Sequence, residues 1–309
     1  MDRNRRVDSA VAALGAAALW GGMYVVSKDT FSQIPPVTLG ALRLVLGGGV
    51  LAAALKWRGR LRWPGDPKLV LAGLLLAGTL VMQFVGTDLA TASEGALLTT
   101  TTPLFIVPMA WAFLGERPTM TTVAGIAIGM AGVALAVGGG PSGHGSAWGP
   151  VLLLVSAAGW AAYTIASAPA SRADGPLVAV TWASIVAMPV VALLSLIEAG
   201  EWRAAPYADP LTLGAVAYLG LAASAGAWYL WNRGVAGLPA AVTGAFFFVQ
   251  PVVGGLLARV VLGERLDWRF AAGGILILIG VLLAVWSPRP GPHPSWPRTA
   301  PASRSKEAA

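Results

Sequence analysis

The sequence predicts an all-α integral membrane protein whose ten transmembrane helices form two inverted five-helix repeats. The 309 residues are 56% hydrophobic and only 11% charged, whereas a soluble domain carries about 25% charged residues. Uncharged runs such as 69–87 and 175–197 exceed the ~18 residues that cross the hydrocarbon of a bilayer. The chain also repeats itself. A water-soluble surface cannot be built from this composition, so the runs are predicted as spans.

Apolar runs recur along the whole chain, and the connections between them are short. The first run follows three arginines and can be read as a signal peptide, but it is long for one and has a partner later in the chain. The predicted spans are residues 9–27, 37–55, 69–87, 94–114, 119–137, 150–168, 177–197, 211–231, 240–262 and 270–287.

Basic residues are distributed unequally between the alternate sides of these spans. With the N-terminus in the cytoplasm, 15 of the 21 Lys and Arg residues lie inside and 5 outside, with Arg43 within a span. This bias follows the positive-inside rule. It predicts a multi-pass protein of the cytoplasmic membrane with both termini in the cytoplasm, and it explains the net charge of +7 without a nucleic-acid partner. Residues 288–309, rich in proline, serine and basic residues, are predicted as a disordered cytoplasmic tail.

An internal repeat divides the chain into predicted units at 9–137 and 150–287. Sliding the sequence by 148 positions aligns 86–137 with 234–285 without a gap, and the tetrapeptide Leu-Gly-Glu-Arg recurs at 114–117 and 262–265. Earlier in each unit the offset is 140, where Trp20 meets Trp160. Each unit holds five spans, and an odd number means that the second copy enters the bilayer upside down, as in many secondary transporters.

Several of these residues carry a resemblance to a known family. The chain has Trp20-Gly21 in the first span, Arg43 in the second, and twice a span that holds a proline and ends in Leu-Gly-Glu. It resembles the drug/metabolite transporter superfamily, EamA type, over roughly residues 9–287. The segment 228–232, followed by Pro-Ala-Ala at 239–241 and by Pro251, is similar to that family's second-half signature. The resemblance implies a ten-helix carrier with cytoplasmic termini, and many such carriers export amino acids, other metabolites or drugs.

Arg43 is the charge within a span, about seven residues from its outer end. Such a charge is costly in hydrocarbon, so it snorkels, pairs, or faces a wet cavity where it orients an anionic group. Asp88 and Glu94 lie at the outer ends of neighbouring spans, and we predict that Arg43 pairs with Glu94 at the outer end of a cavity.

Pro103 and Pro251 lie near the middles of the fourth and ninth spans. Each proline lacks an N–H and frees the carbonyl four residues back, that of Thr99 or Phe247. Threonine hydroxyls at 99–102 can satisfy such a carbonyl. The two predicted kinks either serve packing alone or meet near the midplane, where transporter sites usually lie.

Aromatic and neutral polar residues within the spans are candidates for contact with a solute. Trp20 and Tyr24 share one helix face, as do Trp160 and Tyr163, and repeat symmetry predicts that they face one central cavity. Plain core packing is the alternative. The residues predicted to bind substrate are Trp20, Tyr24, Arg43, Gln83, Glu94, Thr100, Trp160, Tyr163, Trp228 and Gln250.

Small residues and the repeated glutamates have structural interpretations. The Gly-xxx-Gly spacing of Gly125 and Gly129 favours close helix packing within the chain or in a homodimer. Glu116 and Glu264 lie at helix ends, where a cap or loop role is preferred to catalysis.

Composition also limits the chemistry. The chain has no cysteine and two histidines, so no metal cluster is predicted, and no phosphate-binding loop is present. We therefore expect no cofactor and no enzyme activity, but a secondary transporter, most simply an exporter by alternating access, whose partners are a small organic solute and the lipid bilayer. Phosphorylated cargo is disfavoured because Arg43 is the one cation deep within a predicted span, Arg259 being counted with the outer residues near the end of its span. A membrane channel and a membrane-embedded enzyme are the alternatives.

Overall fold

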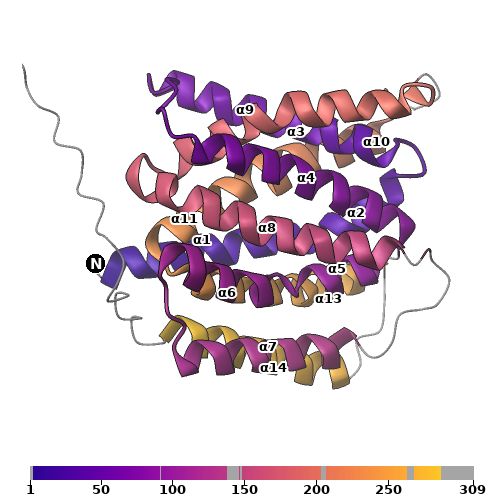
Figure 1. The fold of residues 1–309 in the computed structure, drawn as a ribbon. Helices are drawn as coiled ribbons and strands as arrows, with labels where there is room; N and C mark the ends of the chain where they lie inside the picture. The colour runs from indigo at the N-terminus through magenta and orange to yellow at the C-terminus, as the bar shows by residue number, and fades with distance from the viewer. Residues whose placement is uncertain are drawn as a thin grey trace, which may run out of the picture.

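The computed structural model describes residues 3–90, 92–137, 146, 148–202, 207–262 and 268–286, and these form a bundle of helices without a strand in the described ranges (Figure 1). The first half comprises α1 (Arg3–Gly21), α2 (Met23–Thr30), α3 (Pro36–Trp57), α4 (Lys68–Leu89), α5 (Ala92–Thr99), α6 (Thr102–Leu114) and α7 (Met120–Val137). The second half comprises α8 (Trp148–Ala173), α9 (Pro176–Ser195), η1 (Leu196–Glu198), α10 (Pro210–Ala217), η3 (Tyr218–Gly226), α11 (Ala227–Gly237), α12 (Ala240–Ala245), η4 (Phe246–Phe248), α13 (Val249–Leu262) and α14 (Trp268–Trp286).

The described helices have the length and surface of membrane spans. Seven helical stretches are long and apolar enough to cross a bilayer, and three shorter apolar helices lie at Thr102–Leu114, Met120–Leu135 and Ala271–Trp286. Large apolar side chains such as Val11, Leu193 and Ile275 are exposed on the outside of the bundle. Such a surface is unfavourable in water and suits lipid, so the chain is a multi-pass membrane protein.

Proline and glycine set several helix boundaries. Proline is the first residue of α3, α9 and α10, where its missing N–H costs no helical hydrogen bond. Helix α6 ends at Gly115, whose φ of 67° is left-handed, and the N–H of Glu116 then donates to the carbonyl of Ala110. This turn directs Glu116 across the end of the bundle.

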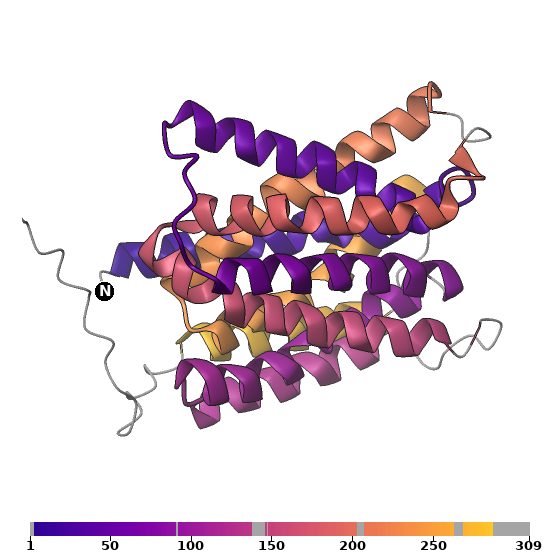
Figure 2. The ribbon, with the colours of Figure 1, turned by 45° about the horizontal axis from the view of Figure 1, so that its top comes forward.

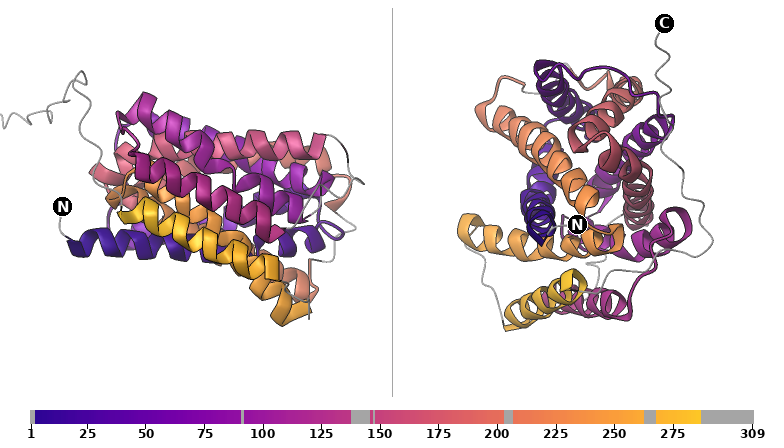
Figure 3. Two further views of the ribbon diagram at one scale, coloured as in Figure 1. Left: turned by 90° about the horizontal axis from the view of Figure 1, so that it is seen from below. Right: turned by 90° about the vertical axis from the view of Figure 1, so that its left-hand side faces the viewer.

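The helices pack as pairs that come from different parts of the chain. Helix α4 packs on α8, α3 on α9, and α1 on α11, while α7 and α14 form a separate layer, seen along the helices in the right-hand view of Figure 3. Figure 2 shows the orange span of α10, η3 and α11 beside the indigo α3, which it contacts through η3. Each of these pairs joins a helix of the first half to one of the second.

Four predicted spans are less regular than expected. The first is divided into α1 and α2 by a turn at Gly22. The fourth is divided into α5 and α6 by a turn at residues 100–101, the eighth contains the π-helical η3, and the ninth contains the 3-10 turn η4 between α12 and α13. Hydrophobic runs predict that a segment crosses the bilayer but not the local winding of its backbone. The predicted tail at 288–309 lies outside the described residues.

Glycines bring α7 and α14 into backbone contact. A Cβ added to Gly125 would lie 2.6 Å from the carbonyl oxygen of Gly280, and a Cβ on Gly280 would lie 2.5 Å from that of Gly125. Gly129 instead faces the ring of Phe248. These glycines serve packing within the chain, so they give no support to the predicted homodimer, which stays a prediction.

We expect Gly280→Ala to lower the free energy of unfolding by about 1–3 kcal/mol, because the methyl group overlaps backbone that cannot easily move. Gly274→Ala in the same helix is the matched control, since a Cβ there meets no atom within 4 Å. Thermal unfolding in detergent measures both. Equal midpoints for the two variants would contradict the close contact between α7 and α14.

Candidate functional site

A cavity of about 340 Å³ lies at the centre of the bundle, and about 20 Å³ of it can hold the centre of a water molecule. That is room for about one or two waters, so the space is narrow in this conformation. Helices α1 to α6, α8, α11 and α13 and the turn η4 contribute to its wall. The lining residues are Trp20, Met23, Tyr24, Arg43, Gln83, Thr99, Thr102, Ser156, Ala157, Trp160, Trp228, Phe247 and Gln250.

The breaks in the fourth and the ninth predicted spans both place residues on this cavity. Thr99 and Thr102 flank the turn between α5 and α6, and Phe247 and Gln250 flank the junction of η4 with α13. The hydroxyl of Thr102 donates to the carbonyl oxygen of Thr99 at 2.6 Å, which is the carbonyl that Pro103 leaves without a helical donor. The predicted use of a threonine hydroxyl beside Pro103 is therefore confirmed for Thr102.

Arg43 is fully inside the bundle, with 1% of its surface exposed, so it does not snorkel. Its Nε donates to Ser224 Oγ at 2.8 Å, Nη2 donates to the carbonyl of Ala223 at 3.1 Å, and Nη1 lies 3.2 Å from Met23 Sδ. The Ala223 carbonyl also accepts from Trp20 Nε1 at 2.9 Å. The π-helical turn therefore supplies the acceptors that hold this buried cation.

Aromatic faces rather than carboxylates surround the rest of the guanidinium. Its carbon lies 5.1 Å from the ring centre of Phe84 and 5.5 Å from that of Trp228, within the range of cation–π attraction. Among the described side chains, the salt bridge present is that of Arg172 with Glu116, not one of Arg43. The side chain of Glu94 lies outside the described residues, so its pairing with Arg43 stays a prediction.

Four aromatic rings from both halves of the chain meet beside the cavity. Trp20 and Trp160 make an edge contact with ring centres 5.1 Å apart, and Phe247 stacks on Trp20 at 5.5 Å. Trp231 lies 4.9 Å from Phe247 and 5.6 Å from Trp20. Trp20 and Trp160 both line the cavity, but they touch each other and do not face each other from opposite sides of it, as the repeat symmetry predicted. The rings give the cavity an apolar wall.

A polar side of the cavity is built from the first half. Gln83 Nε2 donates to the hydroxyl of Tyr24 at 2.9 Å, and that hydroxyl donates to Thr99 Oγ1 at 2.6 Å. The Thr99 hydroxyl in turn donates a hydrogen bond to the carbonyl of Gly95 at 2.7 Å. The chain of bonds fixes Tyr24 between α4 and α5.

The predicted binding residues fall into three groups. Tyr163 and Thr100 are buried but do not line the cavity, and the Tyr163 hydroxyl instead accepts from Asn232 Nδ2 at 2.8 Å behind Trp160. Glu94 is not described at the level of its side chain. The seven that line the cavity are Trp20, Tyr24, Arg43, Gln83, Trp160, Trp228 and Gln250.

Sequence reasoning missed residues whose placement depends on backbone geometry. Ala223 and Ser224 are small residues of η3, and nothing in their spacing indicates a π-helix that would present them to Arg43. Phe247 was detectable, because it is the repeat partner of Thr99 at the offset of 148. Ser156 and Met23 carried no signal beyond their position in a span.

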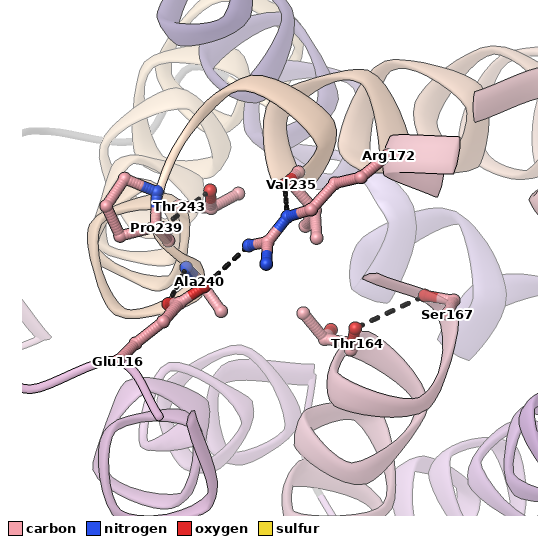
Figure 4. A network of polar contacts seen from close by, with 8 residues as sticks. All are labelled: Glu116, Thr164, Ser167, Arg172, Val235, Pro239, Ala240 and Thr243. Atoms are coloured by element: carbon pink, nitrogen blue, oxygen red, sulfur yellow. Dashed lines mark hydrogen bonds and ion pairs between the residues drawn. The ribbon is translucent and has the colours of Figure 1, made fainter. Parts of the chain in front are cut away.

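A second polar network joins the ends of several helices around Glu116 and Arg172 (Figure 4). Glu116 Oε1 accepts from Arg172 Nη2 at 2.5 Å, and Oε2 accepts from the backbone N–H of Ala240 at 2.7 Å. Arg172 also donates to the carbonyl of Val235 at 3.4 Å. The expected cap role of Glu116 is confirmed, because its carboxylate takes a free N–H at the start of α12. Glu264 lies outside the described residues.

The fold and the cavity together define a class of protein. It is a multi-pass helical membrane protein that encloses a central cavity lined by aromatic and polar side chains, as proteins that pass solutes through a bilayer require. The model of the EamA-like transporter family matches residues 9–138 and again 147–286. The chain belongs to this family of membrane transporters.

Relatives that this chain matches over most of their length are also named as transporters. An uncharacterized transporter of Archaeoglobus fulgidus is 25% identical over 273 residues, which cover 86% of this chain and 93% of that protein. The uncharacterized inner membrane transporter YedA of Escherichia coli strain K12 is 29% identical over 283 residues, covering 86% and 87%. A protein of known crystal structure is similar with a TM-score of 0.77 at 26% identity, covering 90% of this chain and 98% of the other. Family and relatives point to a transporter rather than an enzyme.

We expect Thr102→Val to lower the free energy of unfolding by about 1–3 kcal/mol, because the Thr99 carbonyl then loses its donor within an apolar bundle. Thr102→Ser keeps the hydroxyl and serves as the control, with a smaller loss from the missing methyl group. Thermal unfolding in detergent compares them. If the valine variant were as stable as the serine variant, the hydroxyl would not be what stabilises the broken helix.

Proposed function

We propose that this chain is a secondary transporter that carries a small organic solute, such as a metabolite, an amino-acid-like compound or a drug, across the cytoplasmic membrane. The observation that carries the proposal is the narrow cavity between the helices, whose wall comes from both halves of the chain and includes several broken helices. Such cavities at the junction of two repeats are where carriers bind their solutes.

The proposed architecture is ten spans in two inverted repeats. Residues that correspond in the two repeats lie on the same cavity: Trp20 with Trp160, Thr99 with Phe247, and Thr102 with Gln250. A pseudo-two-fold axis through the cavity accounts for this pairing. It supports alternating access, in which one half rocks against the other around a fixed site.

The proposed orientation places the end of the bundle that carries the Glu116 network in the cytoplasm. Arg60 donates to the carbonyl of Asp174 at 2.9 Å, and Arg6 contacts the carbonyl of Val285, so basic residues from distant loops gather at this end. This distribution supports a cytoplasmic position under the positive-inside rule. Export as the direction of transport is proposed from the family resemblance alone.

The alternatives have less support. Among the described lining residues there is no histidine, cysteine or carboxylate, so an enzyme would lack an evident nucleophile and base. A channel would need a continuous wet path, whereas room for about one or two waters favours an occluded carrier.

The test of function is uptake by proteoliposomes that contain the purified protein, with a panel of radiolabelled amino acids and aromatic metabolites. We expect saturable transport of at least one solute, and Trp160→Ala to reduce it at least tenfold. Trp231→Ala is the control, because Trp231 belongs to the same aromatic cluster but does not line the cavity. Each truncation costs about 3–5 kcal/mol of stability, so thermal stability is measured beside transport. Equal transport by the two variants at equal abundance would remove Trp160 from the site.

We expect Glu116→Ala to open the cytoplasmic side of the cavity more often. Its carboxylate joins the ends of α6 and α8 to the start of α12, and these ends have to separate for the cavity to open there. The N-cap bond contributes about 1 kcal/mol and the partly exposed ion pair less than ~1 kcal/mol. A total of about 1–2 kcal/mol corresponds to a fivefold to thirtyfold change in population.

Labelling of a single cysteine measures this opening, since the chain has no native cysteine. Ser156→Cys reports from the cavity to a membrane-impermeant maleimide, while Arg58→Cys and Glu201→Cys at opposite ends of the bundle identify the two sides. We expect Glu116→Ala to raise the rate from the Arg58 side at least fivefold, and Glu201→Ala to leave it unchanged. Faster labelling from the Glu201 side would refute the network as the cytoplasmic closure.

A further inference from the structure

The cavity carries hydrogen-bond donors that nothing in the described protein satisfies. The indole Nε1 of Trp160 and the amide Nε2 of Gln250 are buried without a hydrogen-bond partner, although their residues are only 7% and 2% exposed. A buried polar group without a partner costs free energy, so such groups in native proteins usually mark a ligand site or a bound water. Both residues line the same small space.

Arg43 adds a positive charge to these donors. Its hydrogen bonds to described residues engage one N–H on each of its three nitrogens, and one of the three acceptors is the weak sulfur of Met23. A guanidinium has five N–H groups, so two of them have no acceptor within the described part of the chain. Arginine presents such pairs in a fork that matches a carboxylate.

The described wall offers few groups that could neutralise a cation or accept from these donors. Arg43 is its one charged residue, and no aspartate or glutamate is among the described lining residues. The hydroxyls of Tyr24, Thr99 and Thr102 direct their protons to oxygens of the protein, so the donors that remain for a ligand are those of Trp160, Gln250 and Arg43. The cavity is therefore complementary to a group that is negative and rich in acceptors.

The remainder of the wall limits the rest of the ligand. One cation favours a single negative charge over a doubly charged phosphate, and the rings of Trp20, Trp160 and Phe247 favour a flat apolar body over a bare inorganic anion.

We propose that the cavity binds a monoanionic organic solute that has a carboxylate and an aromatic or other flat apolar body. Arg43 pairs with the carboxylate, and the N–H groups of Trp160 and Gln250 donate to the solute's oxygens. The inference rests on the proposed transport function and names the substrate class of the same site.

The test uses the full-length protein in detergent and matched probes at pH 7.5, namely phenylacetate, phenylacetamide and phenethylamine, with 4-phenylbutyrate and its amide as a longer pair. Isothermal titration calorimetry measures their affinities. We expect at least one acid to bind about tenfold or more tightly than its amide, as a charge-assisted bond to a buried cation implies, and the amine to bind more weakly than either. Saturable binding by neither acid, or equal binding of acid, amide and amine, overturns the proposal.

Variants assign the preference to the named donors. Arg43→Gln should abolish the preference for the acid, and Arg43→Lys should keep part of it. Arg43 also holds η3, so its loss can unfold the protein; Trp160→Phe therefore provides a second variant, which keeps a ring and removes only the N–H. We expect Trp160→Phe to weaken acid binding about threefold to tenfold. Trp182→Phe is the matched control, because Trp182 Nε1 is also buried without a partner but lies outside the cavity. An equal effect of the two tryptophan variants overturns the assignment.

Transport of the bound acid separates this inference from the proposed function. Proteoliposomes that move a solute of the panel without any preference for acids would keep the transporter and refute the carboxylate site. Acid binding that depends on Arg43, without uptake of that acid or of any other solute, would keep the site and refute transport.

Discussion

The buried charge of Arg43 is the constraint on which the centre of this molecule depends. A cation inside an apolar bundle is stable only where fixed acceptors surround it. Here they come from η3, because the wide π-helical turn presents the Ala223 carbonyl and Ser224 Oγ to α3. The same carbonyl accepts from Trp20, so the charge, the π-helix and the first residue of the aromatic cluster form one unit. π-helical turns are often found at functional sites for this reason.

Close approach of two backbones makes this arrangement possible. A Cβ on Gly47 would lie 2.5 Å from the carbonyl of Gly220, and one on Gly220 would lie 2.7 Å from the side chain of Leu46. The glycines therefore let α3 reach η3 closely enough for the short bonds of Arg43. In a membrane, where apolar side chains gain little from leaving lipid, such tight packing and internal hydrogen bonds are what hold helices together. The glycine pair of α7 and α14 uses the same principle at the other side of the bundle.

The sequence predicted which segments are helical and which residues share a helix face better than it predicted how close each side chain lies to the cavity. Apolar runs located the helices, the repeat placed Trp20 and Trp160 on one cavity, and the position of Glu116 at a helix end indicated a cap or loop role, which its bond with Ala240 agrees with. Helical spacing also put Tyr163 on the face of Trp160, but spacing does not show how far a side chain lies from the cavity, and Tyr163 lies one layer behind it. The π-helix was not predictable, because residues 218–226 have ordinary helix-forming composition and the extra residue per turn is selected by contacts with α3.

Corresponding residues of the two similar halves differ in their chemistry, and these differences make the two sides of the cavity unlike. Where the first half presents Arg43, the second has Ala183, and where the first presents the hydroxyl of Thr99, the second presents the ring of Phe247. A binding site of two equal halves would hold a solute equally well in two opposite poses. Here the charge and the Tyr24 hydrogen-bond chain come from the first half, whereas the rings of Trp160 and Phe247 that line the cavity come from the second. In the proposed transport cycle, the relation between the two repeats would serve the movement of the two halves, while the departures from symmetry would fix which end of a solute each half contacts.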